Sequence, residues 1–66
     1  MAQGTIKKLV SDRGFGFISQ EQGGDIFFHC TAVVGVSFED LRVGQPVEYQ
    51  VEQGKRGLQA VGVNVV

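Results

Sequence analysis

The residues that could do chemistry gather in one stretch, RGFGFISQEQGGDIFFHC, at positions 13–30. It holds four of the five phenylalanines of the chain, with its single histidine and its single cysteine. Phenylalanine rings stack on flat groups, and histidine can titrate or exchange hydrogen bonds. The spacing decides what these side chains do together, because residues two apart in a strand point to the same face.

Alternation sorts these side chains onto two faces of a pair of strands. The aliphatic positions match the apolar faces of later strands, so we predict that Ile18, Ile26 and Phe28 point inward. A barrel of this size has no second layer to cover its outer face. The predicted outward set is Phe15, Phe17, Phe27 and His29. The inverted parity, with these rings in the core, stays open, although His29 would then need a buried partner.

Two further features fit an outer face that binds a ligand. Gly14 and Gly16 flank Phe15 and are predicted to let a ligand approach the strand closely. Five of the six basic residues lie in two short segments of a chain whose net charge is −1. They are Lys7, Lys8, Arg13, Lys55 and Arg56. Basic residues alone would be read as ordinary solvated surface, but rings beside cations suit single-stranded RNA or DNA.

Other chemistries fit the sequence less well. His29 and Cys30 are adjacent in a strand, so we expect them on opposite faces and not as a base and nucleophile. One histidine and one cysteine fall short of a zinc site. Glu48 and Glu52 share a strand face but lie about 13 Å apart. We therefore expect no enzyme, no metal and no cofactor; the remaining alternative is a protein-interaction module that docks partners on the aromatic face.

The elements that position these residues are almost all strands. Sixty-six residues predict one domain, spanning 1–66. Alternating patterns predict strands at 46–53 and 59–66. Turn signals around Asp12–Gly14 and Glu21–Gly24 predict three more, at 4–10, 15–20 and 25–29. Thr31 is expected to cap one helical turn over 31–34, and the rest of 31–45 is a loop. Val61, Val63 and Val65 are assigned to one face of the last strand. The fold class is all-β, a five-stranded antiparallel OB-type β-barrel.

A single cysteine cannot form an internal disulfide, which favours a reducing compartment. The first eight residues lack the apolar core of a signal peptide, and no apolar run is long enough to cross a membrane. We expect a cytoplasmic protein that is mostly monomeric, with dimerisation or strand exchange left open.

Two motifs carry a family resemblance. RGFGFI at 13–18 resembles the first ribonucleoprotein motif of the cold-shock domain family, and DIFFHC at 25–30 resembles the second. The resemblance continues through GTIK, Ala32, Phe38, LRVGQPV and GKRGLQA. It implies a five-stranded barrel that binds single-stranded RNA and DNA with little sequence demand. Such proteins act as RNA chaperones and affect transcription and translation.

The resemblance also implies roles for particular positions. It puts Phe38 on the stacking surface together with the four outward residues. It places basic or polar contacts at Lys7, Arg13 and Arg56. It places hydrogen bonds to bases at Asp25 and Gln59. Lys8 stands where the family usually has tryptophan. Leu9 and Cys30 stand at usual phenylalanines, and Leu58 at a usual proline. The missing rings imply weaker binding than is typical of the family.

Overall fold

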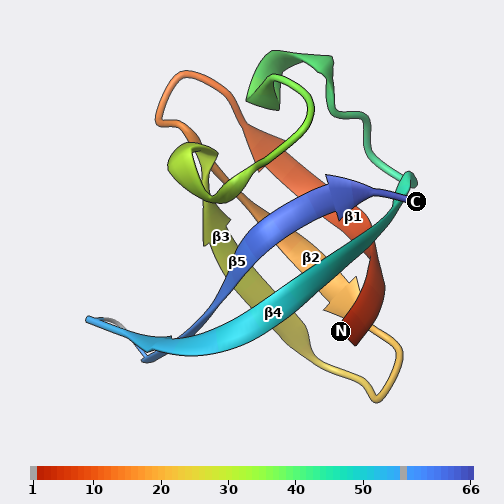
Figure 1. The fold of residues 1–66 in the computed structure, drawn as a ribbon, viewed down its shortest axis with the longest axis vertical. Helices are drawn as coiled ribbons and strands as arrows, with labels where there is room; N and C mark the ends of the chain where they lie inside the picture. The colour runs from red at the N-terminus through yellow and green to blue at the C-terminus, as the bar shows by residue number, and fades with distance from the viewer. Residues whose placement is uncertain (1, 56) are drawn as a thin grey trace.

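The computed structural model describes residues 2–55 and 57–66, in which five strands are joined by turns and short loops (Figure 1). The strands are β1 (Ala2–Val10), β2 (Phe15–Gln20), β3 (Asp25–His29), β4 (Pro46–Gly54) and β5 (Gly57–Val65). Two 3-10 turns, η1 (Cys30–Ala32) and η2 (Phe38–Asp40), lie between β3 and β4. Every predicted strand begins and ends within two residues of an observed one.

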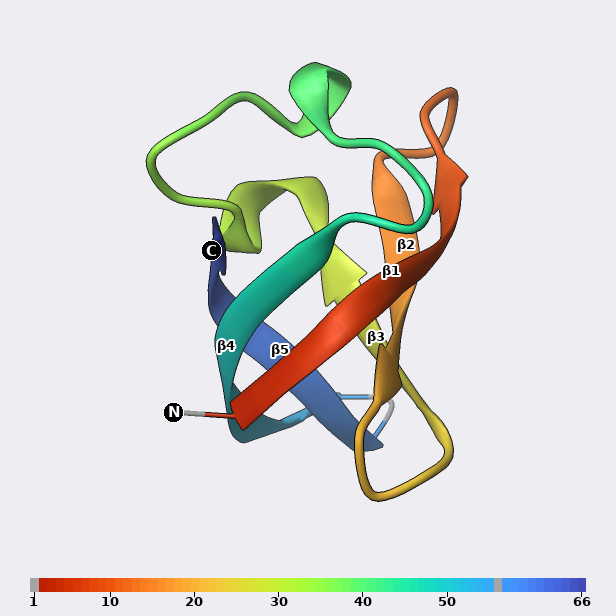
Figure 2. The ribbon, with the colours of Figure 1, turned by 90° about the vertical axis from the view of Figure 1, so that its right-hand side faces the viewer.

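The strands close into a barrel in the order β1-β2-β3-β5-β4, with β1 lying between β2 and β4 (Figure 2). Four neighbouring pairs are antiparallel, as predicted. The pair of β3 and β5 is parallel and short, joining Phe27 to Gln59 and Phe28 to Ala60. One such exception is unavoidable, because directions cannot alternate all the way around a ring with an odd number of strands.

The core confirms the predicted parity of β2 and β3. Ile18 and Phe28 are fully buried, and Ile26 is 3% exposed. The buried set is Ile6, Ile18, Ile26, Phe28, Leu41, Val47, Tyr49, Ala60 and Val63. The inverted arrangement is therefore excluded, and Phe15, Phe17 and Phe27 lie outside this set.

Strand β5 departs from the predicted alternation. Ala60 and Val63 are both buried although they are three residues apart, and Gly62 between them has φ +60°. This left-handed conformation favours glycine, and it interrupts the period of two. The prediction that Val61 shares a face with Val63 and Val65 is wrong, because Val65 packs against the core and Val61 does not.

The segment between β3 and β4 covers one end of the barrel (Figure 1). A helical turn was predicted over 31–34 with Thr31 as its cap, but η1 starts one residue earlier and His29 is its N-cap. Further on, Leu41 is buried and Phe38 packs against the core. In the described part of the chain no helix has the length and hydrophobicity needed to span a membrane.

Candidate nucleic-acid interface

Four side chains on the outside of β2 and β3 form one surface, here called the aromatic face: Phe15, Phe17, Phe27 and His29. The antiparallel register sets Phe15 opposite His29 and Phe17 opposite Phe27. The ring centroids of Phe15, Phe17 and Phe27 lie 5.5–6.0 Å apart in tilted and edge-on arrangements. Each ring is half-buried by its neighbours and His29 is exposed, so the surface is both pre-arranged and open to a ligand.

Gly16 supports this surface from inside the barrel. A Cβ atom at Gly16 would lie 2.7 Å from the carbonyl oxygen of Lys8 and 2.9 Å from the ring of Phe28. Real Cβ atoms do not approach so closely, so glycine is needed to let Phe28 fill the core. The packing of Phe28 is a reason for this glycine that the sequence did not indicate, and close approach by a ligand stays a prediction. Gly14 has φ +72° and belongs to the turn before β2.

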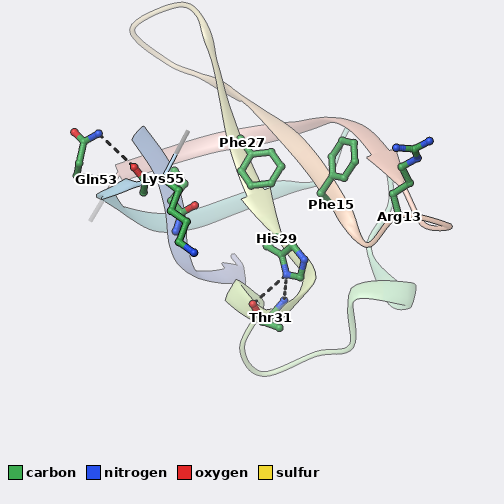
Figure 3. Close-up of a pocket in the computed structure, with 9 residues that line it drawn as sticks. Arg13, Phe15, Phe27, His29, Thr31, Gln53 and Lys55 are labelled. Atoms are coloured by element: carbon green, nitrogen blue, oxygen red, sulfur yellow. Dashed lines mark hydrogen bonds between the residues drawn. The ribbon is translucent and has the colours of Figure 1, made fainter. Parts of the chain in front are cut away.

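An open groove of about 1030 Å³ runs along the aromatic face. Figure 3 shows Phe15 and Phe27 at its centre, with Arg13 on one side and Lys55 on the other. Its lining is Arg13, Phe15, Phe27, His29, Thr31, Gln53, Gly54, Lys55 and Gln59. Gln59 reaches the groove because β5 pairs with β3 at Phe27. Stacking surfaces between two cations suit a strand whose bases are flat and whose backbone is negative.

A second, smaller hollow of about 340 Å³ lies beside Phe17 and is lined by Lys7, Lys8, Phe17 and Asp25. The register of β1 shifts between Ile6 and Lys8, so that Lys7 and Lys8 are both exposed. Lys7 Nζ donates to Asp25 Oδ2 at 2.9 Å, between side chains that are 59% and 39% exposed. Two predicted contact residues therefore engage each other. Exposed ion pairs contribute at most about 1 kcal/mol, so a phosphate could readily displace this one.

His29 and Cys30 lie side by side, contrary to the prediction that they face opposite sides. Cys30 Sγ is 3.7 Å from His29 Nδ1. The strand pattern ends at His29, and Cys30 opens η1, so alternation no longer applies to it. Cys30 is a half-buried free thiol. Among the described residues no group of three or more histidine, cysteine or acidic side chains is arranged to hold a metal ion.

Comparison with known proteins decides the family. The family model described as the 'Cold-shock' DNA-binding domain matches residues 2–66. This chain belongs to the cold-shock domain family. It is 49% identical to the major cold shock protein of Streptococcus pyogenes over 63 residues, covering 96% of this chain and 94% of that protein. It is 48% identical to cold shock protein CspC of Bacillus subtilis, with 96% of each chain covered.

A solved structure supports the same assignment. The chain superposes on Drosophila Unr CSD456 with a TM-score of 0.81 and 33% identity. The match covers 98% of this chain and 26% of that one, so the chain spans about a quarter of the solved structure.

Not every residue implied by the cold-shock resemblance joins the groove. The ring of Phe38 lies 5.9 Å from that of Phe28 and packs against the core, so Phe38 does not line the groove. Arg56 lies outside the described residues. Conversely, Thr31 and Gln53 line the groove although their types gave no signal in the sequence. Only the turn geometry of η1 and the pairing of β4 with β5 bring them there.

Proposed function

We propose that this cold-shock domain, acting as a single domain over residues 1–66, binds single-stranded RNA or DNA on its aromatic face. The observation that carries the proposal is the cluster of Phe15, Phe17 and Phe27, whose ring centroids lie 5.5–6.0 Å apart. Phe15 and Phe27 line the groove flanked by Arg13 and Lys55, and Phe17 lines the adjoining hollow with Lys7 and Lys8. Every base presents a π-face, so such a surface accepts most sequences. Asp25 and Gln59 add a few hydrogen bonds to base edges, which gives modest preferences.

Binding of this kind makes the domain an RNA chaperone. A surface that binds only unpaired nucleotides stabilises the unpaired state by mass action. One base-pair step contributes about 1.4 kcal/mol of stacking, similar to one base–ring contact at about 1–3 kcal/mol. A few contacts therefore melt weak hairpins and leave long helices intact, which in turn affects transcription and translation. With Lys8 and Cys30 in place of two rings, the affinity is below that typical of the family.

The proposal also covers the cellular compartment and the oligomeric state of the domain. The domain works in the cytoplasm, mostly as a monomer, and has no catalytic role. The contact of Cys30 with His29 does not change this, because His29 Nδ1 is already engaged by Thr31. No cofactor or metal is required for stacking and ion pairing.

The test is calorimetric titration with a pyrimidine-rich single strand, because the chain has no tryptophan to report binding by fluorescence. We expect binding to the single strand, much weaker binding to the same sequence as a duplex, and linear loss of log K with log salt. At most five cations reach phosphates, so the slope should not exceed about 3.5 in magnitude, at about 0.7 per phosphate. Failure to bind single strands at low salt would favour the protein-docking alternative.

A further inference from the structure

We propose that Thr31 holds neutral His29 in the tautomer that carries its proton on Nε2, so that His29 offers a hydrogen-bond donor to the bound strand. Thr31 is thus a positioning residue that acts through His29. The role toward a strand rests on the proposed function. The tautomer is a property of the protein alone and can be tested without a ligand.

The geometry around His29 Nδ1 carries this inference. The backbone nitrogen of Thr31 donates to Nδ1 at 3.3 Å, and Thr31 Oγ1 lies 3.1 Å from it (Figure 3). Cys30 Sγ is a third neighbour at 3.7 Å. A hydroxyl or a thiol can either donate or accept, but a backbone N–H can only donate. The N–H of Thr31 therefore requires a lone pair on Nδ1, and the other two groups can turn to donate as well.

The alternative tautomer would leave a backbone hydrogen-bond donor of this turn without its acceptor. A proton on Nδ1 would face the N–H of Thr31, and that donor at the start of η1 would lose its acceptor. His29 is the N-cap of η1, so the same bond also caps the turn. The loss of one ordinary hydrogen bond corresponds to about a twofold to tenfold change in an equilibrium constant. We expect the Nδ1-protonated form to be depleted by that factor relative to an unstructured histidine peptide.

The tautomer of His29 determines which hydrogen bond its ring offers to a ligand in the groove. His29 is exposed and lines the groove beside Phe27, and no described residue makes a hydrogen bond to its Nε2. A donor at this place selects acceptor oxygens, which a single strand offers as base carbonyls or as phosphates. It rejects the exocyclic amino groups of adenine and cytosine, which only donate. His29 thus adds a polar preference to a surface that otherwise selects flat groups.

The first experiment is a long-range ¹H–¹⁵N correlation spectrum of the His29 ring in the free protein at about pH 8, well above the ordinary histidine pKa. We expect the chemical shifts of a protonated Nε2 and an unprotonated Nδ1, with the minor tautomer depleted at least twofold against a blocked histidine peptide. Equal tautomer populations in protein and peptide would overturn the proposal.

Two variants distinguish the effect of the Thr31 hydroxyl from that of its backbone N–H. Thr31→Val removes the hydroxyl and keeps the N–H, so the tautomer should be retained. Thr31→Pro removes the N–H and should raise the Nδ1-protonated fraction toward that of the peptide. If the proline variant does not fold, the wild-type spectrum and Thr31→Val still decide, because a tautomer lost in Thr31→Val would show that the backbone N–H does not hold it.

The same spectrum in the presence of oligothymidine tests the role in binding. We expect the Nε2 proton to become slowly exchanging while Nδ1 stays unprotonated. A strand of abasic sugar-phosphate, added at low salt and at a concentration where calorimetry shows it bound, identifies the acceptor: protection by both strands indicates a phosphate oxygen, and protection by oligothymidine alone indicates a base carbonyl. A strand that binds without protecting Nε2–H overturns the donor role only. A protein that binds no strand overturns the proposed function, while the free-protein spectrum still judges the tautomer.

Discussion

Phe27 and Phe28 follow each other in β3 and face opposite sides of the barrel wall. Phe28 is fully buried, whereas Phe27 is half-buried on the aromatic face beside Phe15 and Phe17. One residue of strand geometry thus separates a ring that fills the core from a ring that is open to a ligand. The pair gives a matched comparison of the two roles within a single strand.

We predict that Phe27→Ala weakens binding to a single strand by about fivefold to a hundredfold, because one base–ring stack contributes about 1–3 kcal/mol. Stability should fall by about 1 kcal/mol, since the ring also touches two neighbours. Phe28→Ala should instead cost about 3–5 kcal/mol of stability, a large part of what a domain of this size possesses. Calorimetry and urea unfolding measure the two effects. A Phe27→Ala protein that unfolds as readily as Phe28→Ala would contradict the assignment.

Tyr49 is a buried residue whose ionisation makes the stability of the fold depend on pH. Its hydroxyl donates to Gln20 Oε1 at 3.2 Å. Burial, with a smaller contribution from the charge of Glu21, raises the pKa of Tyr49 above its ordinary value of 10.0. The folded state therefore keeps this proton at a pH where the unfolded chain releases it.

We predict that the stabilisation from Tyr49 is complete below about pH 10 and is lost as pH rises through the raised pKa. Tyr49→Phe should cost about 1 kcal/mol at neutral pH, through the lost hydrogen bond, and should remove this part of the alkaline decline. Urea unfolding between pH 7 and 11 provides the comparison. The two proteins differ only at residue 49, so the difference between the two curves isolates Tyr49. Parallel curves would show that Tyr49 does not contribute.

At the scale of the elements, the bounds of β2 and β3 were predicted to the residue, because the turn ending in Gly14 precedes β2 and the EQGG turn separates the two strands. Strands β1 and β5 were predicted less well. The irregularity at Lys7 is set by pairing with β2, and the break at Gly62 by the way β5 turns from β3 toward β4. A single strand's pattern contains no information about its partner's register, so such positions appear only in the folded barrel.

Gly16 tests how tightly β1, β2 and the core fit together. We predict that Gly16→Ala destabilises the barrel by about 1–3 kcal/mol, because the new methyl group meets the backbone of β1 and the ring of Phe28. Ser19→Ala is the control, since Ser19 is exposed in the same strand and its change should stay within about 0.5 kcal/mol. Thermal or urea unfolding measures both. Full stability combined with weaker strand binding would instead support a glycine kept for the ligand.

At the scale of the whole molecule, a net charge of −1 conceals a local arrangement that suits an anion. Arg13 and Lys55 flank the groove, and Lys8 lies opposite Phe17 in β2. The sequence indicated which rings and cations would gather, because strand parity and turn positions follow from local pattern. It could not show that Lys7 pairs with Asp25 or that Phe38 turns toward the core, because both depend on how distant segments meet.

The hollow beside Phe17 allows the stacking and charge contributions to be separated at one position. We predict that Lys8→Trp tightens single-strand binding about fivefold. The indole adds about 1–3 kcal/mol of stacking, while the lost charge costs at most about 1 kcal/mol because exposed charges are screened. The slope of log K against log salt should fall by about 0.7, the value for one phosphate contact.

Lys8→Ala is the matched control and should show the same fall in slope with weaker binding, because it loses the charge and gains no ring. Calorimetric titrations at three or more salt concentrations distinguish these outcomes. If Lys8→Trp bound no better than Lys8→Ala, a base would not reach this hollow, and the strand would be confined to the groove between Arg13 and Lys55.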